Sequence, residues 1–274
     1  MRISRPARDA VFTIAGDATW PAIVFETDAE GPHTWRWTIS WKTFSQSGRA
    51  ETPGNTWDAG PVLNGLGGLL VVRAKTPGGS AGLRVKLVGT NPGEGRIKDY
   101  LADKTDGSTM LAIVGQESKF KHFRNNGEPV KSFDNGYGLT QLTNPRPTYT
   151  QAWHWQRNLD AGLALYARKK AEATAYLSAA KRTYTAAQLE RETVSRWNGG
   201  HYHVWDGKAG AWVRRSDVLC DTATGNIGWD MTDADNSGKT EAELHKRDAG
   251  GYGSRTKDSK WRYYGACYAD HVLG

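Results

Sequence analysis

A strict alternation of aromatic and polar residues between positions 34 and 42 constrains the fold more than any other feature of the sequence. The apolar positions are Trp35, Trp37, Ile39 and Trp41, and every residue between them is polar or charged. A period of two places every second side chain on the same face of a β-strand. The sequence therefore predicts a strand whose aromatic face lies in a core. The alternative interpretation of this face is a platform on which sugar rings stack.

The residues on both sides of this strand have the pattern of a small β-domain. Short strands are expected at 11–14, 22–25, 69–74 and 83–88, and the turn-forming segment 76–80 separates the last two. Several short strands with Gly, Pro and Asn between them are typical of a β-sandwich. We expect an immunoglobulin-like sandwich in this part of the chain.

After a Pro- and Gly-containing loop at 91–95, the hydrophobic period becomes helical. Apolar residues recur one helical turn apart from Ile97 to Val114, and Glu117 continues the pattern. The stretch 159–189 is rich in Ala, Leu, Lys and Glu, and Thr185 is suited to cap a further helix. After Gly199 the pattern indicates loops with short helices.

A length of 274 residues suits two domains. The expected fold class is α+β, with the β-sandwich as an accessory domain at 1–92 and a mainly α-helical domain at 93–274. Hydrophobic residues make up 38% and charged residues 24% of the chain, which excludes general disorder. No apolar stretch approaches the roughly 18 residues of a membrane span. The N-terminal residues 1–10 are not followed by an apolar segment, so no cleavable signal peptide is expected.

The formal net charge of +7 indicates an anionic partner in a general way. The Lys and Arg residues form no run longer than pairs such as Lys169-Lys170, so a basic surface is favoured over a nucleic-acid site. Cys220 and Cys267 both lie in the last quarter of the chain without His residues at zinc-ligand spacing. We expect one disulfide between them, and two independent buried thiols are the alternative.

Glu117 is the candidate for acid–base chemistry. It lies at the end of an apolar helix face, where partial burial would raise the pKa of its carboxyl group. A neutral carboxylic acid near pH 7 can protonate the leaving oxygen of a glycosidic bond. A surface Glu at a helix end is the alternative if this residue is taken alone.

Glu117 does not stand alone, because three further elements follow it in a specific order. The four elements are Glu117-Ser118, Gly138-Leu139-Thr140-Gln141, Asn158-Leu159-Asp160-Ala161-Gly162 and Trp197-Asn198-Gly199-Gly200. Over roughly residues 95 to 205, this set resembles the lysozyme-like superfamily of lytic transglycosylases and goose-type lysozymes.

The resemblance implies a muramidase that cleaves the β-1,4 bond between N-acetylmuramic acid and N-acetylglucosamine, without a cofactor in catalysis. It implies that Glu117 is the catalytic acid and base. It also implies a set of residues that contact the glycan: Ser118, Tyr137, Gly138, Gln141, Trp197 and Asn198. Trp197 stands where the family usually has Tyr, and Thr140 where it often has Met. Trp197 can still stack on a sugar ring, and core packing is the alternative for it.

The reaction after protonation depends on whether a second carboxylate positions water. Asp134 precedes the Gly138 segment near the place where goose-type lysozymes carry such a residue, and Glu128 lies in the same loop. An Asx-turn residue before Asn-Gly is an equally good interpretation of Asp134. Hydrolysis and lytic transglycosylation, which needs one carboxylate, both remain open.

A second motif, at 233–244, resembles the start of an EF-hand calcium loop. The candidate ligands are Asp233, Asp235, Ser237, Lys239, Glu241 and Glu243. Leu244 stands where the bidentate Glu belongs, so a structural Ca²⁺ site and a polar surface turn are both compatible with the motif. His201 and His203 lack a third ligand, which favours a groove-edge or surface role over zinc.

The resemblance and the missing signal peptide together indicate a protein delivered by a dedicated machine, such as a type VI secretion effector or a phage-associated enzyme. It would act in the periplasm of a target bacterium or on the cell wall, with peptidoglycan strands and an immunity protein as partners. The alternative function is a non-catalytic module that binds or assembles the wall and contains an inactive lysozyme-like domain.

Overall fold

The computed structural model describes residues 1–274 and combines α-helices with several β-sheets, so the fold is of the expected α+β class. The chain forms two compact units, Met1–Gly162 and Leu163–Gly274, which are described separately here. The helices between residue 93 and Gly162 therefore belong to the same compact unit as the N-terminal strands. This division differs from the expected boundary at 92. The expected boundary separates an accessory part from a catalytic part, and that assignment of functions stays a prediction.

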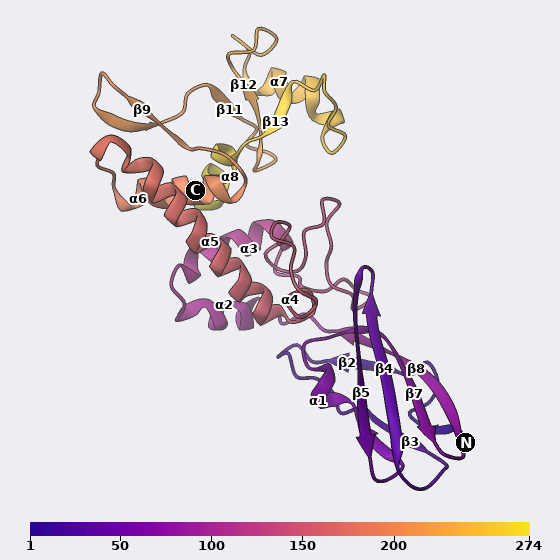
Figure 1. Cartoon of the computed structure of the whole chain (residues 1–274). Helices are drawn as coiled ribbons and strands as arrows, with labels where there is room; N and C mark the ends of the chain where they lie inside the picture. The colour runs from indigo at the N-terminus through magenta and orange to yellow at the C-terminus, as the bar shows by residue number, and fades with distance from the viewer. The chain divides into compact units, whose positions relative to one another are not determined.

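The first unit contains two sheets. Its strands are β1 (Ile3–Arg5), β2 (Val11–Ile14), β3 (Val24–Thr27), β4 (His33–Trp41), β5 (Phe44–Thr52), β6 (Thr56–Asp58), β7 (Gly68–Thr76) and β8 (Gly79–Gly89). The larger sheet has the order β2-β8-β7-β4-β5, with its long antiparallel strands visible in Figure 1. The smaller sheet has the order β1-β3-β6. Only the pair of β2 and β8 is parallel.

The aromatic face of β4 lies in the core of this unit, as predicted. Trp35 and Ile39 are fully buried, and Trp37 and Trp41 are each 6% exposed. Trp35 reaches the smaller sheet, where its ring lies 5.9 Å from that of Trp57. Because these rings are enclosed between elements, the alternative of a sugar-stacking platform does not apply to them.

The other strand predictions are confirmed except in their bounds and in one omission. The strand at 11–14 is present, the one at 22–25 begins two residues later, and β7 and β8 form a hairpin around Pro77-Gly78. Strand β5 was not predicted, because its outward residues are polar and its inward positions include Gly48. A Cβ at Gly48 would lie 2.5 Å from the ring of Trp37, so the missing side chain makes room for the neighbouring indole.

The helices of the first unit are α1 (Gly60–Leu63), α2 (Glu94–Ala102), α3 (Gly107–Ser118), α4 (Tyr149–Trp153) and the start of α5 (Trp155–Leu177). The predicted apolar face of α3 is confirmed, since Met110, Ile113 and Val114 are fully buried. No helix in the chain combines the length and the apolar composition needed to cross a membrane.

The second unit contains the end of α5 and five short strands that the sequence analysis missed. Its other helices are η1 (Ala179–Lys181), α6 (Ala186–Trp197), α7 (Glu241–Asp248), η2 (Ala249–Gly251) and α8 (Gly265–Leu273). Its strands are β9 (His203–Asp206), β10 (Ala211–Arg214), β11 (Val218–Cys220), β12 (Ile227–Asp230) and β13 (Trp261–Tyr263). The prediction of loops with short helices after Gly199 is confirmed by α7, η2 and α8, but it omitted the five strands. Each of these strands is only three or four residues long and pairs in a small sheet.

Two other features of the second unit were predicted correctly. Thr185 caps α6, accepting a hydrogen bond from the backbone N–H of Gln188, whose side chain accepts one from the N–H of Thr185. Cys220 and Cys267 form a disulfide with a Cα–Cα distance of 5.3 Å. The bridge joins β11 to α8 beside a small core of four buried residues: Ile227, Trp229, Leu244 and Trp261.

Candidate functional site

Glu117 lies in the last turn of α3 and is half-buried, together with Ser118. The hydroxyl of Ser118 donates a hydrogen bond to the carbonyl of Val114 at 3.1 Å. The helix ends abruptly because Lys119 and Phe120 both have left-handed backbone conformations, with φ values of 52° and 60°. Two successive non-glycine residues in this region are unusual, and such strain is concentrated at functional sites.

The chain that leaves this helix end packs directly against the Gly138 segment. The N–H of Val130 donates to the carbonyl of His122 at 2.8 Å, and the N–H of Gly138 donates to the carbonyl of Val130 at 3.0 Å. Gly138 has a φ of +71°, and a Cβ there would lie 2.7 Å from Cε1 of His122. The glycine is therefore required both by its backbone conformation and by the close imidazole.

Asn158, near the start of α5, holds the segment from the other side. Its Oδ1 accepts hydrogen bonds from the backbone N–H and the hydroxyl of Thr140, both at 3.0 Å. Its Nδ2 donates to the carbonyls of Tyr137 at 3.0 Å and Gln151 at 3.2 Å. The side chain is fully buried, so it uses its whole hydrogen-bonding capacity to fix the backbone of the segment.

Gly162 lies one helical turn after Asn158 and completes this contact. A Cβ at Gly162 would lie 2.6 Å from Cγ2 of Thr140, so only glycine lets the helix approach so closely. Within the segment, Gln141 donates from Nε2 to the carbonyl of Gly138 at 2.6 Å. The structure thus brings together two of the elements that the sequence singled out, the Gly138–Gln141 segment and the helix start with Asn158 and Gly162.

His122 was missed by the sequence analysis. The ring is fully buried, and burial lowers the pKa of its imidazole to about 3. The side chain of Asn91 holds the backbone here, because its Oδ1 accepts the N–H groups of His122 and Phe123 at 2.7 and 2.8 Å. Nothing in the local sequence distinguishes a buried His from a surface one, so its contact with Gly138 emerges only from the fold.

Two other predicted residues of this loop have clear structural roles. The ring of Tyr137 is 3% exposed and packs edge-on against Trp41 and Phe44, while its backbone supports the Asn158 contact. Asp134 is exposed and accepts a hydrogen bond from the hydroxyl of Ser132 within its own turn. The turn interpretation of Asp134 is thus compatible with the structure, and the water-positioning role stays a prediction.

Trp197 and Asn198 belong to the second unit, at the end of α6, and both are half-buried. The loop that follows them is held by Glu192, a fully buried carboxylate one turn before the helix end. Its Oε2 accepts the N–H groups of Tyr202 and His203, both at 3.0 Å. The loop therefore leaves the helix in a fixed direction.

The Glu192 carboxylate is also surrounded by basic side chains. Its Oε1 accepts from Nε of Arg196 at 3.0 Å and lies 3.0 Å from Nδ1 of His201. Burial alone would raise the pKa of Glu192, but hydrogen bonds from His203 and Tyr202 and the charge of Arg196 lower it. His203 is 3% exposed, which corrects the expectation of a surface role for this residue.

The predicted calcium ligands form hydrogen bonds and ion pairs with several separate groups. Nζ of Lys260 lies 2.6 Å from Oδ2 of Asp235 and 3.4 Å from Oδ2 of Asp233. Glu243 accepts from the N–H of Thr240 at 2.8 Å in the cap of α7, and Glu241 accepts from the N–H of Thr222 at 2.8 Å. No group of three or more His, Cys, Asp or Glu side chains is arranged to hold a metal ion. The residues as placed do not form a calcium cage, and calcium binding stays a prediction.

The comparisons with known proteins do not identify a family for this chain. No model of a known protein family matches it, and no curated protein matches it. The residues described above and their geometry are therefore the basis for a function.

Proposed function

We propose that this protein is a peptidoglycan-degrading muramidase that uses Glu117 as its general acid and base. The observation that carries the proposal is the arrangement around the end of α3. There, a half-buried carboxyl group precedes a strained helix end, and the chain leaving that end packs against the rigid Gly138–Gln141 segment. A fixed wall beside an acid is what a glycosidase needs to orient a saccharide against its proton donor.

The proposed reaction begins when Glu117 protonates the glycosidic oxygen between N-acetylmuramic acid and N-acetylglucosamine. In a hydrolase, Asp134 would then position the water that attacks the anomeric carbon from the opposite face. In a lytic transglycosylase, the substrate's own acetamido group and its C6 hydroxyl would replace that water, and the C6 oxygen would bond to the anomeric carbon to give a 1,6-anhydro product. The exposed turn that carries Asp134 leaves its carboxylate accessible to solvent, which is compatible with the first route.

The finer fold assignment is part of the same proposal. We infer an immunoglobulin-like sandwich in the N-terminal part, supported by two sheets that share one tryptophan-rich core. The rest of the chain would be the lysozyme-like domain, and glycan contacts by Trp197 and Asn198 stay a separate prediction for the second unit. The Cys220–Cys267 disulfide is typical of proteins that work in an oxidising compartment, which supports action in a periplasm or on a wall.

Loss of turbidity of purified peptidoglycan tests the proposal. Replacing Glu117 by Gln keeps the size of the side chain but removes its acid, and we expect the rate to fall about 10²- to 10⁴-fold. Glu94→Gln is the matched control, because Glu94 is an exposed carboxylate in the first turn of α2. Equal activity of the Glu117→Gln and wild-type proteins would contradict the proposal.

The same assay separates the alternatives. A wild-type protein that binds peptidoglycan but never lowers its turbidity would be a wall-binding module instead of an enzyme. Mass spectrometry of the released fragments distinguishes the two reactions, because transglycosylation gives only anhydro-muramyl products and hydrolysis gives reducing ends.

A further inference from the structure

The outward face of the larger sheet carries a row of cations that the proposed reaction does not use. Arg36 on β4 is directly opposite Arg49 on β5 and Arg73 on β7. One step along the strands, Thr34 lies between Glu51 and Lys75 in the same way. All four basic side chains are exposed.

These cations are largely unbalanced. Arg49 pairs with Glu51, whereas Arg36, Arg73 and Lys75 form no ion pair with any acidic side chain. Like charges placed directly opposite each other on neighbouring strands destabilise a sheet. An arrangement of three arginines side by side therefore costs stability in the free protein, and an anion bound across the row would remove that cost.

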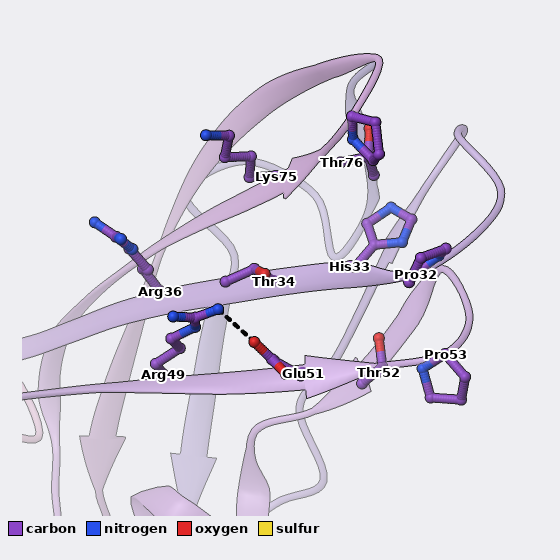
Figure 2. Close-up of a pocket in the computed structure, with 11 residues that line it drawn as sticks. Pro32, His33, Thr34, Arg36, Arg49, Glu51, Thr52, Pro53, Lys75 and Thr76 are labelled. Atoms are coloured by element: carbon purple, nitrogen blue, oxygen red, sulfur yellow. Dashed lines mark hydrogen bonds and ion pairs between the residues drawn. The ribbon is translucent and has the colours of Figure 1, made fainter.

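Arg36, Arg49 and Lys75 line a pocket of about 720 Å³. Arg73 lies outside this lining, directly opposite Arg36 on the neighbouring strand. Figure 2 shows the side chains of Arg36 and Lys75 extending in the same direction from neighbouring strands, with Arg49 beside them. The hydroxyl-bearing residues Thr34 and Thr52 also line this pocket. None of the residues predicted to act on the glycan belongs to it, so it is a separate site within the first unit.

We propose that this pocket, together with Arg73 beside Arg36 in the row, binds neighbouring phosphate groups of a flexible phosphodiester polymer. Adjacent strands are about 4.8 Å apart, so the row from Arg49 to Arg73 spans roughly 10 Å. One phosphate is too small to contact the whole row, and two successive phosphates match it. A phosphate presents its oxygens in several directions and can accept hydrogen bonds from guanidinium groups on two strands. A carboxylate instead forms a planar, bidentate pair with one guanidinium group.

The composition of this face favours a polymer without bases. The large apolar side chains exposed on β7 are Leu69 and Val71, and no exposed aromatic ring lies on the outward positions of β4, β5 or β7. Sites for single-stranded nucleic acid stack bases on such rings. A chain of alditol phosphates, as in phosphate-rich wall polymers, needs only the cations and hydroxyls that are present. This binding goes beyond the proposed cleavage of peptidoglycan and does not depend on it.

Fluorescence anisotropy with labelled poly(glycerol phosphate) tests the proposal on the full chain. The test variant is Arg36→Ala with Arg73→Ala, and the control variant is Arg8→Ala with Arg96→Ala, which removes the same charge from exposed positions elsewhere. We expect affinity to fall at least about tenfold in the test variant and less than about twofold in the control. The slope of log affinity against log salt should also fall by about 1 to 2.

Several outcomes would overturn the proposal. These are no binding by the wild type, equal losses in both variants, tighter binding of poly-glutamate, or tighter binding of single-stranded DNA of equal charge. Misfolding is excluded by thermal melting, because removing like charges from an exposed face should keep or raise the melting temperature. Lysis of polymer-free peptidoglycan should be equal in the test variant and the wild type, so failure of this proposal is distinct from failure of the proposed enzyme activity.

Discussion

Each unit of this protein fixes a glycine-containing loop against a helix with one fully buried side chain, but the two side chains differ in charge. In the first unit the neutral amide of Asn158 holds the Gly138 segment. In the second unit the carboxylate of Glu192 holds the loop after Asn198. We call Asn158 the neutral clamp and Glu192 the charged clamp. Both fix a loop against a helix, one with an uncharged side chain and the other with a charged one.

The difference lies in what each clamp requires from its surroundings. An amide both donates and accepts, so Asn158 is satisfied by the backbone and one hydroxyl without any counter-charge. A carboxylate only accepts, and its burial is tolerated because Arg196 and two backbone N–H groups face it. Each hydrogen bond of Glu192 is therefore stronger than each of those of Asn158, but the Glu192 contacts also require the neighbouring side chains to keep their charge.

The largest expected effect comes from breaking the charged clamp. Glu192→Ala leaves the guanidinium of Arg196 and the N–H groups of Tyr202 and His203 without their acceptor. We expect the second unit to lose about 3–5 kcal/mol of stability, as is typical when one partner of a buried ion pair is removed. Amide hydrogen exchange at backbone groups of the second unit that do not bond to Glu192 measures this loss and separates it from the first unit.

A matched control is Glu190→Ala, because Glu190 lies on the same helix and is exposed. Similar losses from both substitutions would mean that helix α6, not the clamp, determines the effect. The contrast between Glu192 and Asn158 would then reflect only a difference in stability between their helices.

Breaking the neutral clamp should cost less. Asn158→Ala removes the acceptor for the N–H of Thr140 and leaves that buried group unpaired, so we expect a loss of about 1–3 kcal/mol in the first unit. Asn158→Asp keeps the acceptor but loses both donors and introduces a buried charge. Hydrogen exchange at Thr140 and the rate of peptidoglycan cleavage should change together, because Asn158 acts by positioning the wall of the proposed site. Unchanged protection of the Thr140 amide would contradict this role.

The elements predicted best are those whose own side chains determine them. Strand β4 has its hydrophobic face in its own sequence, and α3 and the Thr185 cap likewise contain their own signals. The bridge between Cys220 and Cys267 followed from the count of cysteines. In the candidate site, the sequence singled out the Gly138 segment and the helix start with Asn158 and Gly162, and these two elements are in contact in the structure.

The elements missed are those that depend on a neighbour. Strand β5 reads as polar because the indole of Trp37 occupies the space above Gly48, so its buried surface comes from the adjacent strand. The strands β9 to β13 are too short to show a period. His122 and Glu192 are single polar residues whose burial is set by distant segments, which no local pattern records.

Acidification sharpens the comparison of the two units, with a smaller effect. Burial lowers the pKa of His122 from 6.5 to about 3, so between these values the unfolded chain binds a proton that the folded protein does not. The stability of the first unit should therefore fall by about 1.4 kcal/mol for each pH unit below 6.5 through this residue. The lowered pKa of Glu192 acts in a different pH range, because its contribution to the stability of the second unit is lost only as the pH falls below its ordinary value of 4.5.

Between pH 6.5 and 5, hydrogen exchange should show the first unit losing stability before the second. His122→Leu should lower the slope of unfolding free energy against pH by about 1.4 kcal/mol per pH unit. An unchanged slope in His122→Leu would show that another group, such as His154, causes the loss.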